Sequence, residues 1–213
     1  MANKKDIAYG VSRALFAIRT FNEEKNEYEY GDYTDILGVT KVEIDAPKLS
    51  DDTYALDEVH ISGGDDSPAP LEGTLSMIQA TNPEFKKVIG YKKDSDNKTE
   101  YTGQNTPVAM AFIEELKNED YVYDEILHVY YNVKPSEAKV SMETTTDKIT
   151  ERTFEIPIKV FRANFINHKP GPQSRYQEVK RSEVTDEVWT SLLKTVVRMK
   201  EDKTTVDQPE NKG

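Results

Sequence analysis

The chain has 213 residues, of which 36% are apolar and 31% charged, and its 28 basic and 39 acidic side chains give a formal net charge of −11. A chain this acidic repels a phosphate backbone, which argues against nucleic-acid readout and against binding to anionic membranes. It has no cysteine, which excludes disulfides, thiol nucleophiles and thiolate metal sites, and no apolar run approaches the length that spans a membrane.

The chain begins with a polar stretch that predicts an arm over residues 1–10. This stretch lacks the apolar core of a signal peptide, so we expect a protein that is made and used in the cytosol, or exported only as part of something larger. From Val11 to Phe21, apolar side chains occupy both faces of a predicted strand. A strand that is apolar on both faces is either central in a sandwich or covered by a partner.

Residues 22–35 form an acidic segment that predicts an exposed hairpin with its turn near Asn26. The segment carries three aromatic residues, Tyr28, Tyr30 and Tyr33. Aromatic rings among charged side chains can stack on a sugar or on a partner protein. More often they form cross-strand pairs on a solvated sheet face.

A strand over residues 36–46, with Val42 and Ile44 facing inward, leads into a polar insertion over residues 47–70. Six acidic residues of the insertion are candidates for contact with a partner: Asp51, Asp52, Asp57, Glu58, Asp65 and Asp66. We expect one short strand inside it, over residues 53–61. Polar insertions of this length are usually functional or disordered.

Residues 70–91 predict a strand followed by a short helix. Apolar or small residues alternate with polar ones from Leu71 to Met77, which is the period of a strand. Asn82 can cap the helix, Pro83 suits its first position, and Gly90 can end it. The helix has an apolar stripe for packing, formed by Phe85, Val88 and Ile89.

The next part of the chain is predicted to be a polar loop over residues 92–105 and then a series of strands. These strands are expected over residues 108–113, 125–133, 138–142 and 153–162. In the strand over residues 125–133, the residues Leu127, Val129, Tyr131 and Val133 are expected on one face. Pro157 lacks an amide N–H, so its strand is expected to lie at an edge or to carry a bulge.

A proline-rich break over residues 168–172 precedes a final helix, expected over residues 186–199 with Thr185 as its cap. The apolar stripe of this helix contains Trp189, Leu192, Leu193, Val196 and Val197. Because a short isolated helix is marginal in water, we expect it to pack, through Trp189 and Leu193, on the sheet of its own subunit or of a neighbour. Residues 201–213 are expected to form a flexible polar tail.

No motif for catalysis, for a cofactor or for a metal is found in the sequence. His60, His128 and His168 lie in unrelated segments without the spacing of a zinc-protease helix, and a structural role is expected for His128. No Gly-x-Ser-x-Gly nucleophile motif is present. We therefore expect a protein without enzymatic activity.

Three features together resemble the major tail proteins of phages with long, non-contractile tails. The first is the strand–helix sequence LEGTLSMIQATNPEFKKVIGY. The second is VAMAFIEELKNED followed by ILHVYYNVKPSEAKVSMETTTDKITERTFEIPIKVFRA. The third is the order of the N-terminal strand, the acidic insertion and the final helix with its tryptophan. The resemblance covers residues 8–200 and departs from the family pattern between Asn164 and Ser182.

The resemblance implies a single, mainly antiparallel β domain over residues 1–200. It would be sandwich-like or barrel-like, with one helix after a central strand and a short C-terminal helix. The implied function is that of a structural virion protein, without a cofactor, whose copies form stacked, usually hexameric rings that conduct DNA during ejection. The insertion over residues 47–70 would reach the next ring.

The implied location is the tail of the virion, after assembly in the host cytoplasm. Implied partners are other copies of the chain and adjoining tail proteins, such as the tape measure and the tail terminator. DNA would pass through the lumen without specific binding, and no membrane is involved. A carbohydrate-binding β-sandwich with Tyr28, Tyr30 and Tyr33 as its platform is the alternative.

Overall fold

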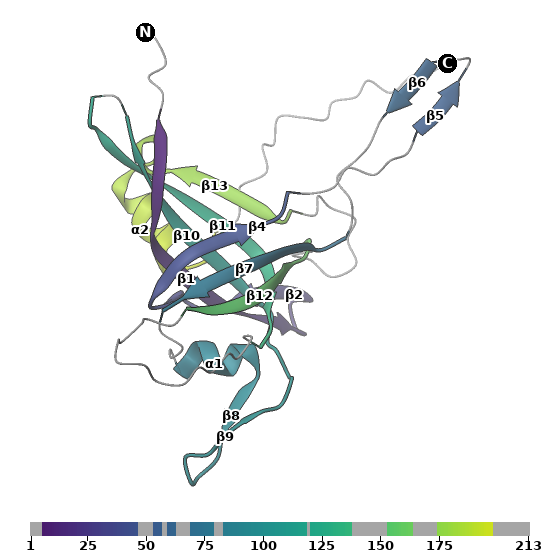
Figure 1. Cartoon of the computed structure of the whole chain (residues 1–213), viewed down its shortest axis with the longest axis vertical. Helices are drawn as coiled ribbons and strands as arrows, with labels where there is room; N and C mark the ends of the chain where they lie inside the picture. The colour runs from purple at the N-terminus through teal and green to yellow at the C-terminus, as the bar shows by residue number, and fades with distance from the viewer. Residues whose placement is uncertain are drawn as a thin grey trace, which may run out of the picture.

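The computed structural model contains one large, curved antiparallel sheet, which has nine strands within the described part of the chain (Figure 1). The described residues are 6–46, 53–56, 59–62, 69–78, 83–118, 120–137, 153–163 and 174–197. The strands of the sheet are β1 (Ile7–Asn22), β2 (Glu27–Tyr30), β3 (Thr34–Asp35), β4 (Val39–Ile44), β7 (Leu71–Met77), β10 (Val108–Lys117), β11 (Tyr123–Pro135), β12 (Phe154–Val160) and β13 (Tyr176–Lys180). They follow the order β2-β1-β10-β11-β12-β7-β4, with β3 paired to β1 and β13 paired to β11.

Two small hairpins and three short helical segments complete the described structure. The hairpins are β5 (Thr53–Leu56) with β6 (Val59–Ser62), and β8 (Tyr91–Lys93) with β9 (Thr99–Tyr101). The helical segments are α1 (Pro83–Ile89), the 3₁₀ turn η1 (Arg181–Glu183) and α2 (Asp186–Lys194). The expected fold class, mainly antiparallel β with a helix after a central strand and a short C-terminal helix, is confirmed.

The connection between β3 and β4 shows that the sheet coils back on itself. β3 pairs with β1 and β4 pairs with β7, near opposite ends of the strand order. Only residues 36–38 separate the two strands. Both sides of this link are hydrogen-bonded, because the Ile36 amide donates to the Ala14 carbonyl and the Ile78 amide to the Gly38 carbonyl, each at 2.8 Å. The two ends of the sheet therefore lie close together, as in a barrel.

The inner face of this coil holds the first of two apolar cores, which we call the inner core. Residues from β1, β4, β7, β10, β11 and β12 contribute to it. Helix α1 packs against it through the three residues expected from the sequence, Phe85, Val88 and Ile89, all of which are buried. The Phe85 ring lies 5.4 Å from the ring of Phe16 in β1. Gly90 ends the helix at φ +112°, as expected.

The outer face of β1, β10 and β11 carries a second apolar core, which we call the outer core, and α2 covers it. Trp189 and Leu192 are buried there with Leu15 of β1, and Leu193 packs beside them. Of the two expected alternatives, a sheet of its own subunit or of a neighbour, α2 packs on the sheet of its own subunit. β1 is thus apolar on both faces because it lies between two cores of its own chain.

Helix α2 begins as expected and ends earlier than expected. The Thr185 side chain accepts a hydrogen bond from the Val188 amide at its start. The helix ends at Lys194 rather than at residue 199, because Thr195 has an extended backbone and forms a bridge with Asp32. Three β-branched residues in succession, from Thr195 to Val197, favour this extended conformation.

β11 changes its pairing partner along its length, and this change alters which core its residues reach. Residues 126–130 pair with β13, whereas residues 133–135 pair with β12. Tyr130 lies opposite Met110 but Val133 lies opposite Val108, so β11 has an extra residue there. The sequence expectation of one apolar face was wrong for Val133. It turns into the inner core, whereas three residues face the outer core, Leu127, Val129 and Tyr131.

Pro157 does not mark an edge strand or a bulge, contrary to expectation. β12 lies between β11 and β7, and its register with β7 is continuous from Phe154 to Val160. The Ser136 amide donates to the Pro157 carbonyl at 2.9 Å, just beyond the last paired residues of β11. The nitrogen of Pro157, which has no hydrogen to donate, therefore lies at the end of the ladder between β11 and β12. At such a position an internal strand tolerates proline.

Four further boundaries differ from the sequence expectations. β1 begins at Ile7, so the last four residues of the expected arm belong to this strand. Residues 53–62 contain two strands instead of one, and the expected loop over 92–105 contains β8 and β9. β13 was not expected at all. The expected strand over 138–142, the Asn82 cap and the tail over 201–213 lie outside the described residues.

Candidate assembly surfaces

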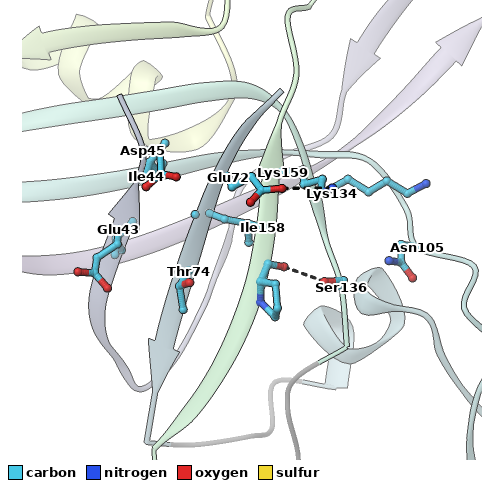
Figure 2. A pocket seen from close by; sticks show the side chains of 13 residues that line it. Glu43, Ile44, Asp45, Glu72, Thr74, Asn105, Lys134, Ser136, Ile158 and Lys159 are labelled. Atoms are coloured by element: carbon cyan, nitrogen blue, oxygen red, sulfur yellow. Dashed lines mark hydrogen bonds and ion pairs between the residues drawn. The ribbon is translucent and has the colours of Figure 1, made fainter. Parts of the chain in front are cut away.

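The first candidate surface is the outward face of β4, β7 and β12, where strand register places polar side chains in rows (Figure 2). It has a hollow of about 910 Å³. Glu43 and Asp45 lie on the β4 side, Glu72 lies on the central strand β7, and the lysines Lys134 and Lys159 lie on the opposite side. Lys159 Nζ and Glu72 Oε1 are 3.5 Å apart. Because exposed ion pairs contribute little to stability, this pair does little to hold the three strands together.

Gly73 of β7 lines the same hollow, and a larger residue at this position would collide with the neighbouring strands. A Cβ at this position would lie 2.4 Å from the Glu43 carbonyl oxygen and 3.2 Å from Ile158 Cγ1. Glycine therefore lets β4 and β12 approach β7 closely. This requirement concerns packing and gives Gly73 no chemical role.

The histidine that the structure places in the sheet has partners on both ring nitrogens. His128 Nδ1 lies 2.6 Å from the Tyr176 hydroxyl and Nε2 lies 3.2 Å from Glu114 Oε2. The Tyr176 hydroxyl donates to Glu178 at 2.6 Å, and burial together with this hydrogen bond raises the pKa of Tyr176. The structural role of His128 stays a prediction, and these two contacts are what it would rest on.

Asp124 connects the start of β11 to the segment before α2. It accepts hydrogen bonds from the Ser182 amide at 3.1 Å and from the Ser182 hydroxyl at 2.5 Å. Lys180 Nζ is 3.6 Å from the same carboxylate. Burial raises the pKa of Asp124, but the hydrogen bonds and Lys180 outweigh it, so the pKa lies below its usual value.

The three tyrosines proposed as a sugar platform do not form one exposed surface. The Tyr30 hydroxyl donates to the Tyr131 carbonyl at 2.9 Å, and both Tyr30 and Tyr33 pack against the outer core. Burial raises the pKa of Tyr33. Tyr28 lies beneath the Arg19 guanidinium, 3.5 Å from it. The hairpin turn expected near Asn26 is confirmed, with Asn26 at φ +53°.

The structure separates the predicted site residues into two groups. The helix-packing residues are divided between the two cores, with Phe85, Val88 and Ile89 in the inner core and Trp189 and Leu193 at the outer core. The acidic residues of the insertion lie outside the part that can be described: Asp51, Asp52, Asp57, Glu58, Asp65 and Asp66. Their proposed role in contacts between rings stays a prediction.

One exposed cluster was missed by the sequence reasoning. Tyr9 of β1 and Tyr123 of β11 meet with their ring centroids 6.3 Å apart. The run Tyr121-Val122-Tyr123 is a signal that could have indicated it, because three adjacent large residues on a hairpin cannot all be buried. Tyr9, however, is brought to this run only by the pairing of β1 with β10.

Among the described residues, no group of three or more histidine, aspartate or glutamate side chains is placed so that it could hold a metal ion. The helices of the same residues include none long and apolar enough to cross a membrane.

Comparison with known protein families identifies the family to which the chain belongs. A family model described as phage tail tube protein matches residues 1–203. No curated protein matches the chain. The matched segment contains every described helix and strand, including both cores and the coiled sheet between them. The chain therefore belongs to the phage tail tube protein family and is a structural protein of the viral tail.

Proposed function

We propose that copies of this protein form hexameric rings that stack into the tail tube, and that DNA passes through the lumen during ejection. The observation that carries this proposal is the family match over residues 1–203. The fold supports it, because a coiled sheet with an apolar core on each face is suited to a structural subunit. The proposed assembly takes place in the host cytoplasm, with tape measure and tail terminator proteins as neighbours in the tail.

The charge of the chain suits a conduit for DNA. Duplex DNA carries one negative charge about every 1.7 Å of its length. A wall built from copies with a net charge of −11 repels it and so limits adhesion during transit. Screening at physiological salt acts over about 8 Å, so only acidic side chains near the bore contribute.

We further propose that the acidic insertion over residues 47–70 contacts the neighbouring ring. Its six acidic residues and single lysine give the segment a strong local negative charge. A basic or hydrogen-bonding surface on the next ring would satisfy these carboxylates.

Electron microscopy of the purified protein, combined with mass measurement over a concentration series, tests the proposed assembly. We expect six-fold rings at intermediate concentration and tubes at high concentration. A strict monomer at every concentration, or closed oligomers that never stack, would contradict the proposal. Added duplex DNA is expected to leave the mass of the rings unchanged at physiological salt, because no specific DNA binding is involved.

A further inference from the structure

β1 begins at the end of the molecule where β10 and β11 are joined (Figure 1). This end carries an exposed apolar cluster, which we call the aromatic tip. Its five members and their exposed fractions are Ile7 (59%), Tyr9 (52%), Tyr121 (72%), Val122 (59%) and Tyr123 (64%). A hollow of about 450 Å³ lies among them, also lined by Lys117 and Asn118. Contiguous exposed apolar patches on soluble proteins usually mark interaction sites.

The backbone of the tip presents Tyr121 in an unfavourable conformation. The turn between β10 and β11 holds Tyr121 at φ +62°, a region that glycine and asparagine enter more easily than a bulky aromatic residue. The Asn118 side chain stabilises this turn by accepting from the amides of Asp120 and Val122, at 2.9 and 3.0 Å. A large side chain kept in a strained and exposed position points to a role outside the folding of its own chain.

The polar character of the tip favours an acidic partner. Lys117 Nζ lies 4.1 Å from the centre of the Tyr121 ring and 5.4 Å from that of Tyr123. Lys117 takes part in no ion pair within the described residues. A second copy of the chain, with 39 acidic side chains, offers carboxylates to this cation.

The edge of the adjoining strand is also unpaired on one side. Residues 7–13 of β1 pair with β10, whereas β2 and β3 form backbone pairs with β1 only from Leu15 onward, among the residues that the structure describes. The Arg13 side chain nevertheless reaches Asp35 of β3. On this side of β1, within the described part of the chain, only residues 7–10, beside the tip, present a backbone edge that could accept a further strand.

We propose that the aromatic tip is a contact surface for a second copy of this chain, an inference that rests on the proposed self-assembly. Aromatic residues with few charges are the composition of the centre of a protein interface. Each aromatic side chain can bury about 150–250 Å², so the five residues supply several hundred of the roughly 800 Å² that a stable interface needs per partner. The unpaired edge of β1 supplies the remainder.

The test is Tyr121→Asn in the full-length protein, with Tyr9→Ser as a second variant. Asparagine suits a positive φ, so Tyr121→Asn is expected to leave the melting temperature of the subunit unchanged or raised. The concentration for half-assembly, measured by sedimentation, is expected to increase at least about tenfold for both variants. The matched control is Leu37→Ser, which removes another exposed apolar side chain (57%) away from the tip and should assemble like the wild type.

Each result separates the two proposals. If the wild type assembles and Tyr121→Asn assembles at the same concentration, the tip proposal is wrong while the proposed function stands. Equal loss of assembly in Leu37→Ser would also overturn it, because the effect would then follow from any exposed apolar residue. A wild type that stays monomeric would contradict both.

Discussion

At the scale of single residues, Asp124 holds two segments together that are far apart in the chain. Its carboxylate joins the start of β11 to Ser182 and Lys180, and its side chain is only 16% exposed. Since these donors lower its pKa, the folded subunit binds the proton of Asp124 more weakly than the unfolded chain does. The resulting stabilisation is complete above the ordinary pKa of about 4 and is lost as the pH falls through the lower, folded value.

We predict that Asp124→Asn makes the subunit less stable at neutral pH, by about 1–3 kcal/mol. The difference from the wild type should shrink when the pH falls below about 4, because the wild-type carboxylate then becomes protonated as well. Urea unfolding of the unassembled subunit between pH 7 and pH 3 measures both effects. Asp35→Asn, at an exposed pair with Arg13, is the control and should change stability less. A difference independent of pH would contradict the prediction.

The sequence predicted single residues well where one face of an element is buried. Phe85 and Trp189 follow a helical period and are buried as expected. It failed for Val133 and Tyr9, whose surroundings depend on the bulge in β11 and on pairing with a strand about a hundred residues away. Periodicity reports the local backbone, and neither of these features is local.

At the scale of elements, α2 is the outer layer of the molecule. Trp189 is only 6% exposed, and the Arg181 guanidinium lies 5.5 Å from its ring. The helix has nine residues, so tertiary packing has to supply its stability.

We predict that Trp189→Ala lowers the stability of the subunit by about 3–5 kcal/mol, which thermal unfolding measures. Val188→Ala on the exposed side of the same helix is the matched control and should have little effect. As the only tryptophan, Trp189 should emit at short wavelength and resist quenching by solutes. A red-shifted, quenchable emission with an unaltered melting temperature in Trp189→Ala would show that the indole is not packed.

The strands that were not predicted from the sequence are short and lack a full apolar face. β8 and β9 are largely exposed on both faces, so their sequence has no alternation to detect. Their turn contains Asn97 at φ +66°, a position that the asparagine itself could have indicated. β13 has only five residues and is defined by its pairing with β11. Elements with a full apolar face were found, such as β7, β12 and α1.

At the scale of the whole molecule, growth of the tube is expected to depend on the acidic insertion. We predict that deleting residues 62–67 leaves the melting temperature of the subunit near that of the wild type but prevents stacking of rings. Deletion of residues 208–213, the same number from the polar C-terminus, is the control and should still give tubes. Electron microscopy of both variants is the measurement. Tubes of normal length from the first variant would show that the insertion does not join rings.

The position of β1 between two cores also has a consequence for synthesis of the chain on the ribosome. β1 is made first, but its principal neighbour β10 begins at Val108, about ninety residues later. At about 5–20 residues per second, translation leaves β1 without this neighbour for roughly 5–20 s. During that time both apolar faces of a sixteen-residue strand are uncovered. A nascent chain stalled before residue 108 should therefore recruit chaperones, whereas the complete chain released from the ribosome should not.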